Sequence, residues 1–139
     1  MPVEAFLDTN VLIYAAAGRR DAPEKAERAW SLIEKGNFGL SAQVLGEFYV
    51  NVVKKPAVPL QPEEAATWID RLCVFPVVPV DADLVREALR NSRRYLLSYW
   101  DAAIIAAAER LGAPILYSED LNHSQAYGSV RVVNPFASH

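Results

Sequence analysis

The amino-acid sequence predicts an α/β fold in which helices cover a central, mostly parallel sheet. Short apolar runs of strand length alternate along the chain with longer segments whose apolar residues recur every three or four positions. Capping residues, glycines and prolines stand at the ends of these segments. The chain has 139 residues and a hydrophobic fraction of 52%, which is enough for one compact domain spanning residues 1–139. No internal repeat or composition shift suggests a second domain.

Five short segments are predicted to be strands. The first of them is apolar and ends abruptly at the carboxylate of Asp8. The third contains Pro79, which cannot donate a hydrogen bond within a sheet, so this strand is expected at an edge or to stop there. The five segments are residues 3–7, 38–40, 77–80, 114–117 and 130–133.

Six segments beside these strands are predicted to be helices. Ser41, Asp81 and Ser98 are placed to cap three of them, and Pro62 fits the first turn of another. The helix after Ser98 is apolar on nearly every side over residues 102–108, so it is expected to be buried. The six segments are residues 11–17, 22–35, 42–55 and 62–72, the residues after Asp81, and those from Ser98 to Gly112.

Composition restricts the kinds of partner and compartment. The net charge of −3 and the sequence pI near 5.4 mean that contacts with nucleic acid would need local basic patches or a bound cation. The single cysteine, Cys73, excludes an internal disulfide, and its apolar neighbours predict a core thiol. No signal peptide is supported, and no apolar run approaches the ~20 residues needed to cross a bilayer. We therefore expect a soluble, cytoplasmic protein.

Acidic residues are expected to gather at one edge of the sheet, where the carboxyl ends of parallel strands meet. Asp8 and residues 118–120 directly follow predicted strands. Asp101 lies in the first turn of a helix that starts from this edge, and Glu47 lies about one and a half turns into another. The acids expected to converge are Asp8, Glu47, Asp101 and either Glu119 or Asp120.

Each of these acids also has a purely structural explanation. Asp8 could cap the helix that follows it, and Asp101 could be the acidic half of a capping box with Ser98. Glu47 could be an ordinary surface glutamate, and either acid after the fourth strand could be a plain loop residue. Only their convergence would make them a site.

A cluster of carboxylates at this edge predicts a metal site. Clustered carboxylates repel and raise one another's pKa unless a cation lies between them. Mg²⁺ and Mn²⁺ are the usual solution, because both prefer oxygen ligands, and one or two such ions could activate a water for phosphodiester hydrolysis. No glycine-rich phosphate loop, nucleophile elbow or histidine metal motif competes as the chemical centre.

Five short blocks follow one another along the chain, and in this order they resemble a known family. The blocks are FLDTNVL at residues 6–12, SAQVLGEF at 41–48, SYWDAAI at 98–104, LYSEDL at 116–121 and VVNPF at 132–136. Together they resemble the PIN-domain ribonucleases, and most closely the VapC-type toxins of toxin–antitoxin pairs. The resemblance covers essentially the whole chain, and no single block would carry it.

This resemblance implies a fold, an activity and partners. The fold would be a three-layer α/β/α arrangement around a five-stranded parallel sheet, usually in a homodimer. The activity would be endonucleolytic cleavage of an RNA substrate by a metal-activated water, blocked by a cognate antitoxin in a type II toxin–antitoxin system. Two alternatives are a PIN-fold nuclease of RNA processing that is not a toxin, and a non-catalytic regulatory module.

The resemblance also implies roles for individual residues. The residues that would hold Mg²⁺ or Mn²⁺ are Asp8, Glu47, Asp101 and Asp120. Asn10 and Ser118 would be polar supports, and Ser118 keeps the hydroxyl of the threonine that the family often has there. Glu119, directly before Asp120, contests the place of the fourth acid.

Two further groups of residues are relevant to binding. Arginines could hold RNA phosphates, although a solvated basic helix face is the alternative for those after residue 89; they are Arg19, Arg20, Arg90, Arg93 and Arg94. Trp30 and Tyr49 belong to apolar helix stripes and are expected in the core. Part of these stripes could instead form a groove for an antitoxin helix.

Overall fold

The computed structural model describes residues 3–137, and this part of the chain forms six helices and six strands. The strands are β1 (Ala5–Leu7), β2 (Phe38–Ser41), β3 (Val77–Val78), β4 (Ile115–Tyr117), β5 (Ala126–Tyr127) and β6 (Val130–Val133). The helices are α1 (Thr9–Ala17), α2 (Pro23–Lys35), α3 (Ala42–Val52), α4 (Pro62–Leu72), α5 (Ala82–Tyr95) and α6 (Tyr99–Arg110).

The strands form one sheet in the order β3-β2-β1-β4-β6-β5, and all neighbours are parallel except β5 and β6. β1 lies inside the sheet, since Ala5 pairs with Phe38 of β2 on one side and with Ile115 of β4 on the other. The predicted α/β class, the mostly parallel sheet and the edge position of β3 are confirmed.

The sheet has one strand more than the five that were predicted. β5 is only two residues long and lies in a segment that the sequence marks as polar loop. A tight turn joins β5 to β6. Within this turn Gly128 takes a φ of 61°, a left-handed conformation that glycine adopts without a steric penalty. So short a strand has no hydrophobic pattern of its own, because the turn and the neighbouring β6 decide its position.

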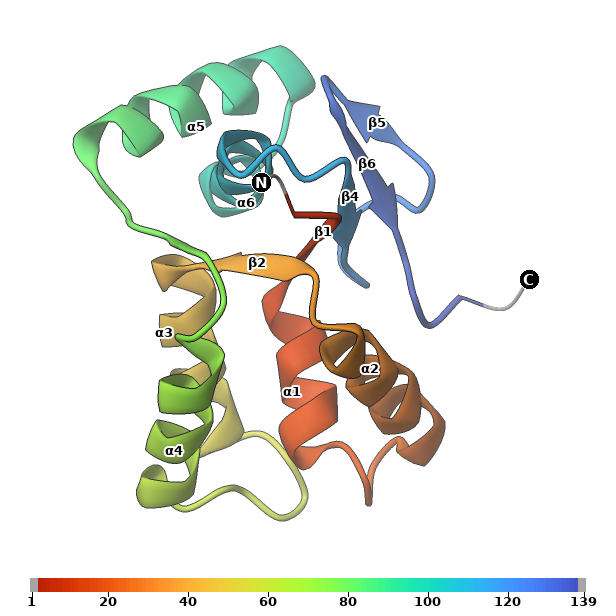
Figure 1. Ribbon diagram of the computed structural model, residues 1–139. Coiled ribbons are helices and arrows are strands. Elements are labelled where there is room, and N and C mark those ends of the chain that lie inside the picture. The colour runs from red at the N-terminus through yellow and green to blue at the C-terminus, as the bar shows by residue number, and fades with distance from the viewer. Residues whose placement is uncertain (1–2, 138–139) are drawn as a thin grey trace.

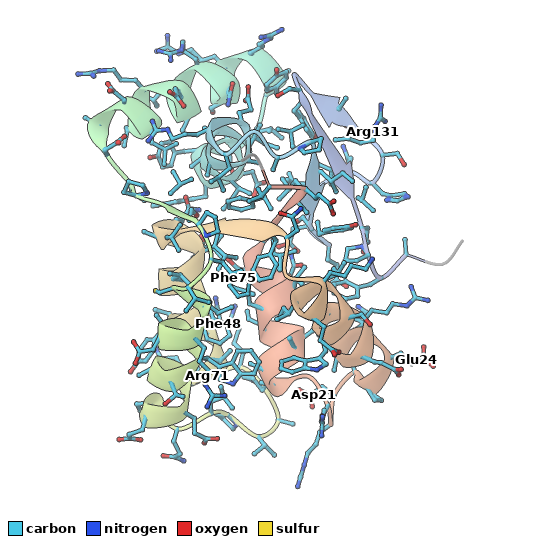
Figure 2. The ribbon with its side chains drawn as sticks, viewed as in Figure 1. Asp21, Glu24, Phe48, Arg71, Phe75 and Arg131 are labelled. Carbon is cyan, nitrogen blue, oxygen red and sulfur yellow. The ribbon has the colours of Figure 1, made fainter. Side chains whose placement is uncertain are left out.

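Helices cover both faces of the sheet. Figure 1 shows α5 and α6 on one side of the strands and α1 to α4 on the other, which gives the expected three layers. In α6 every residue from Ala102 to Ala108 is buried, as the apolar run predicts. Phe48 of α3 is fully buried on the opposite side, whereas charged side chains such as Glu24 and Arg131 project outward (Figure 2).

Polar residues at the strand ends start the helices that carry the candidate site. Ser41 accepts a hydrogen bond from the backbone of Val44 at the start of α3, and Ser98 accepts one from the backbone of Asp101 at the start of α6. Each bond satisfies an amide that the first turn of a helix leaves without a partner. The caps therefore fix where α3 and α6 begin relative to the sheet.

Three sequence expectations about burial are wrong. Cys73 is exposed, because α4 ends at Leu72, which takes the core position beside it. Trp30 and Tyr49 are 44% and 36% exposed, so these helix stripes are wider than the core that they face.

Among residues 3–137, no helix is both long enough and apolar enough to span a membrane.

Candidate active site

Asp8 lies at the carboxyl end of β1 and is 7% exposed. Its Oδ1 accepts a hydrogen bond from the backbone amide of Thr9 at 2.7 Å, and its Oδ2 accepts one from the hydroxyl of Ser118, also at 2.7 Å. Ser118 follows β4 and is fully buried. Asp8 therefore caps α1, which confirms its expected capping role, and also joins the ends of the neighbouring strands β1 and β4.

Asp120 is connected to Asp8 through the two predicted polar supports. The hydroxyl oxygen of Ser118 accepts a hydrogen bond from the backbone amide of Asp120 at 3.1 Å. Asn10 donates from its Nδ2 to Oδ2 of Asp120 at 3.1 Å, and its Oδ1 accepts from the backbone amide of Glu119 at 3.3 Å. Asn10 and Ser118 thus bridge two segments about 110 residues apart and bring Asp120 close enough for its charge to act on Asp8.

Glu119 has different partners from its neighbour. Its Oε1 accepts a hydrogen bond from the hydroxyl of Tyr14 at 2.7 Å, and its Oε2 accepts one from Nζ of Lys25 at 2.5 Å. The bond to Glu119 raises the pKa of Lys25, and burial together with the same carboxylate raises the pKa of Tyr14. It is therefore the side chain of Asp120, and not that of Glu119, that is hydrogen-bonded to Asn10 beside Asp8.

Glu47 and Asp101 approach the same edge from α3 and α6. Gln43 donates from its Nε2 to Oε1 of Glu47 at 2.7 Å and, at 3.4 Å, to the backbone carbonyl of Trp100, next to Asp101. This bond links the first turns of the two helices. None of the ion pairs formed by residues 3–137 involves any of the four acids Asp8, Glu47, Asp101 and Asp120.

Burial dominates the electrostatics of Asp8. It raises the pKa of this carboxyl from 3.8 to about 6, because a buried carboxylate loses its hydration. The hydrogen bonds from Ser118 and Thr9 lower this pKa, and the negative charges of Asp120 and Glu47 raise it. The negative charges of Asp120 and Glu47 therefore both reach the carboxyl of Asp8. Asp101 acts on Tyr127 of β5, whose pKa is raised by burial and, to a smaller extent, by the Asp101 charge.

The donor set at this edge suits a hard cation. Within the described part of the chain, no three His, Cys, Asp or Glu side chains lie close enough together to enclose a metal ion. Mg²⁺ ordinarily keeps several of its waters and takes only one or two carboxylates from the protein, so separated carboxylates fit such an ion. The polar side chains around Asp8 offer oxygens and no thiolate or imidazole, and the buried hydroxyl of Thr9 has no hydrogen-bond partner among residues 3–137.

The structure does not bring all the predicted basic residues to this edge. α1 has 9 residues, so at ~1.5 Å per residue its far end lies roughly 14 Å from Asp8, and Arg19 and Arg20 follow that end. Arg90, Arg93 and Arg94 are exposed on α5. The last two lie in the final turn of α5, shortly before the start of α6 in the chain, and are therefore the better placed of the five.

Sequence reasoning missed three residues that organise this region. Gln43 precedes Glu47 by four positions, a spacing that places two side chains on one helix face and could have revealed the pair. Tyr14 and Lys25 had no such signal, because their contact with Glu119 depends on how α1 and α2 pack.

Comparison with known proteins adds information about the family and the fold. The family model of the PIN domain matches residues 5–129. A toxin–antitoxin complex from Klebsiella pneumoniae contains a chain with a TM-score of 0.70 and 22% identity, over 95% of this chain and 98% of that one. No curated protein sequence matches the chain.

Two other solved structures have a similar fold. VapC20 of Mycobacterium tuberculosis, described as a sarcin-ricin loop cleaving toxin, has a TM-score of 0.67 and 23% identity, over 84% of this chain and 89% of that one. The DNA-bound VapBC complex from Salmonella typhimurium has a TM-score of 0.64 and 17% identity, over 94% of this chain and 96% of that one. At these identities the likeness describes the fold.

The raised pKa of Asp8 predicts a pH-dependent effect of Asp8→Asn on stability. Between pH 3.8 and about 6 the folded state keeps a proton that the unfolded state has lost, so the free energy of unfolding of the wild type falls as pH rises through this window. Asparagine has no charge to bury. We expect Asp8→Asn to gain roughly 2.5 kcal/mol relative to wild type between pH 4 and pH 8. Urea unfolding in the presence of chelator measures this difference.

Asp70→Asn, which changes an exposed acid of α4, is the matched control and should show no comparable gain. An equal effect of Asp8→Asn at both pH values would show that burial of the Asp8 charge is not destabilising.

Proposed function

The chain belongs to the PIN domain family, and from this premise we propose that it is a Mg²⁺- or Mn²⁺-dependent endoribonuclease. The observation that carries the proposal is the hydrogen-bonded series Asp8, Ser118, Asp120 and Asn10, which sets two carboxylates from different segments side by side. The charge of Glu47 acts on the same buried carboxyl. An all-oxygen site of this kind suits a hard divalent cation.

In this proposal each residue has a defined task. Asp8 and Asp120 hold the ion, and Glu47 and Asp101 complete the acidic set around it. Ser118 and Asn10 orient the first two carboxylates through the bonds described above. When bound, the cation would activate a water and stabilise charge on the scissile phosphate. A cation beside Asp8 would also favour the charged carboxylate, since an opposite charge lowers the pKa of an acid.

We propose RNA as the substrate because of the likeness to a solved structure. VapC20 has a similar fold and is described as cleaving the sarcin-ricin loop. Arg93 and Arg94 lie near the start of α6, where they could hold phosphates, and the half-exposed Tyr99 is available to stack on a base. The compartment that we propose is the cytoplasm.

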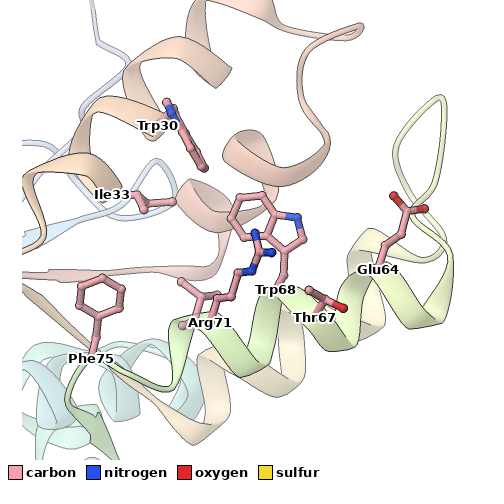
Figure 3. Close-up of a pocket in the computed structure, with 8 residues that line it drawn as sticks. Trp30, Ile33, Glu64, Thr67, Trp68, Arg71 and Phe75 are labelled. Carbon is pink, nitrogen blue, oxygen red and sulfur yellow. The ribbon is translucent and has the colours of Figure 1, made fainter.

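We also propose a cognate antitoxin as protein partner, since the structures from Klebsiella and Salmonella are complexes of this kind. The antitoxin would dock at a cavity of about 330 Å³ between α2 and α4 (Figure 3). The rings of Trp30 and Trp68 pack edge to face there, with 5.7 Å between their centroids. The cavity is also lined by Ile33, Phe75 and Arg71. None of the four acids lines it. An apolar helix face would cover the exposed ring of Trp30 and the partly buried rings beside it.

Two other functions remain alternatives, and the homodimer remains a prediction. A PIN-fold nuclease of RNA processing would cleave RNA without an antitoxin partner. A non-catalytic module would keep the fold but have no need to bind the ion. Binding of Mn²⁺ therefore separates the two nucleases from the non-catalytic module. Binding of a protein encoded by a neighbouring gene separates the toxin from the RNA-processing nuclease.

Replacing one metal-holding acid should abolish cleavage. Because even the partners of metal ligands often contribute 10–100-fold, we expect Asp8→Asn or Asp101→Asn to lower RNA cleavage by at least ~100-fold. The assay incubates the purified protein with tRNA and rRNA fragments, with Mg²⁺, Mn²⁺ or chelator, and maps the cut ends. Asp70→Asn should cleave like wild type. Full metal-dependent cleavage by Asp8→Asn would contradict the assignment.

A charge in the cavity should separate antitoxin binding from catalysis. Trp30 is 44% exposed, so Trp30→Glu places a charge at the cavity without emptying the core. We expect this change to weaken antitoxin binding by at least ~30-fold, the size typical of a buried aromatic anchor, and to leave RNA cleavage by the free chain unchanged. Calorimetric titration measures the affinity. Val58→Glu, at an exposed apolar residue that does not line the cavity, is the control. Equal loss in both variants would argue against this surface.

A further inference from the structure

Glu119 and Asp120 are consecutive acids at the end of β4, yet their side chains have separate partners. Asp120 shares hydrogen bonds with Asn10 and Ser118. Both carboxylate oxygens of Glu119 are occupied elsewhere, Oε1 by the hydroxyl of Tyr14 and Oε2 by the ammonium of Lys25. A carboxylate whose two oxygens each accept a hydrogen bond must break both bonds before it can turn toward a neighbouring cation.

The group that holds Glu119 is itself fixed by several contacts. Lys25 lies on α2 and Tyr14 on α1, and their polar atoms are 3.3 Å apart. The ammonium also lies 5.0 Å from the centre of the Tyr14 ring and 5.8 Å from that of Phe136. The two rings meet edge to face at 4.9 Å. Favourable cation–ring contacts of this kind hold Lys25 in place beyond its single ion pair.

The short turn after β4 transmits this fixation to Asp120. The backbone amide of Glu119 donates to Oδ1 of Asn10, while Nδ2 of the same Asn10 side chain donates to Asp120. The side chain of Asn10 is thus hydrogen-bonded to both residues, to the backbone of Glu119 and to the carboxylate of Asp120. With the side chain of Glu119 held by α1 and α2, the turn presents Asp120 and not Glu119 to the neighbours of Asp8.

We propose that Lys25, with Tyr14, is a positioning residue that keeps Glu119 out of the metal-holding acids. Glu119 is then unavailable to a cation held beside Asp8 and Asp120. This inference rests on the proposed function. An added carboxylate raises the charge of an oxygen site and tightens its hold on a divalent ion, so loss of Lys25 should strengthen ion binding. The effect should act through Glu119.

A double-mutant cycle with Mn²⁺ as the probe tests this role. Calorimetric titration of Lys25→Met is expected to show Mn²⁺ binding tightened at least about threefold, because Glu119 joins the site. Glu119→Gln alone should lie within about twofold of wild type, and Lys25→Met in the Glu119→Gln background should return to that range. A salt concentration of about 0.3 M screens the remote charge of Lys25. Lys25→Arg, which keeps the ion pair, should bind Mn²⁺ like wild type.

Three outcomes would overturn this inference and leave the proposed function standing. Unchanged Mn²⁺ binding by Lys25→Met would show that Lys25 does not restrain Glu119. A tightening that persists in the Glu119→Gln background would show that Lys25 acts through its own charge. Weaker binding by Glu119→Gln alone would show that Glu119 already holds the ion. Failure of the wild-type chain to bind Mn²⁺ would instead overturn the proposed function, and this inference with it. Thermal unfolding of each variant confirms that it is folded.

Discussion

The structure depends on one buried carboxylate at the end of the central strand. Asp8 caps α1 through the amide of Thr9 and accepts the hydroxyl of Ser118 from the end of β4. β1 pairs with β4, a strand far from it in the sequence. The side chain of Asp8 therefore lies where the ends of these two strands come together. Two hydrogen bonds offset part of the desolvation, but the pKa of about 6 shows that burial dominates. A cation at this place would offset the rest.

The remaining parts of the candidate site are arranged around that carboxylate. Asn10 and Ser118 bring Asp120 to it, and Gln43 ties Glu47 to the start of the helix that carries Asp101. The caps of α3 and α6 fix where these two helices leave the sheet edge. Glu119 is held apart by Lys25 and Tyr14. Acid placement thus follows from strand ends, helix caps and a few hydrogen bonds between distant segments.

Much of this arrangement could be predicted from local patterns. The apolar runs, Pro62, Ser41 and Ser98 marked the strands and helix starts, because caps and periodicity are local chemistry. The ends of β1 and β4 also predicted that Asp8 and Asp120 lie at one edge of the sheet. The exposure of Trp30 and Cys73, the strand β5 and the different partners of Glu119 and Asp120 could not be predicted. Each of these depends on how segments far apart in the chain pack, and no single segment encodes that packing.

The central claim is that one edge of the sheet holds a divalent cation between Asp8 and Asp120. Diffraction from crystals soaked in Mn²⁺, recorded at the manganese absorption edge, tests it most directly. The account predicts an anomalous peak about 2.0–2.3 Å from a carboxylate oxygen of Asp8 or Asp120, with waters completing the shell and Glu119 still on Lys25. A peak elsewhere on the protein, with none beside Asp8, would contradict it.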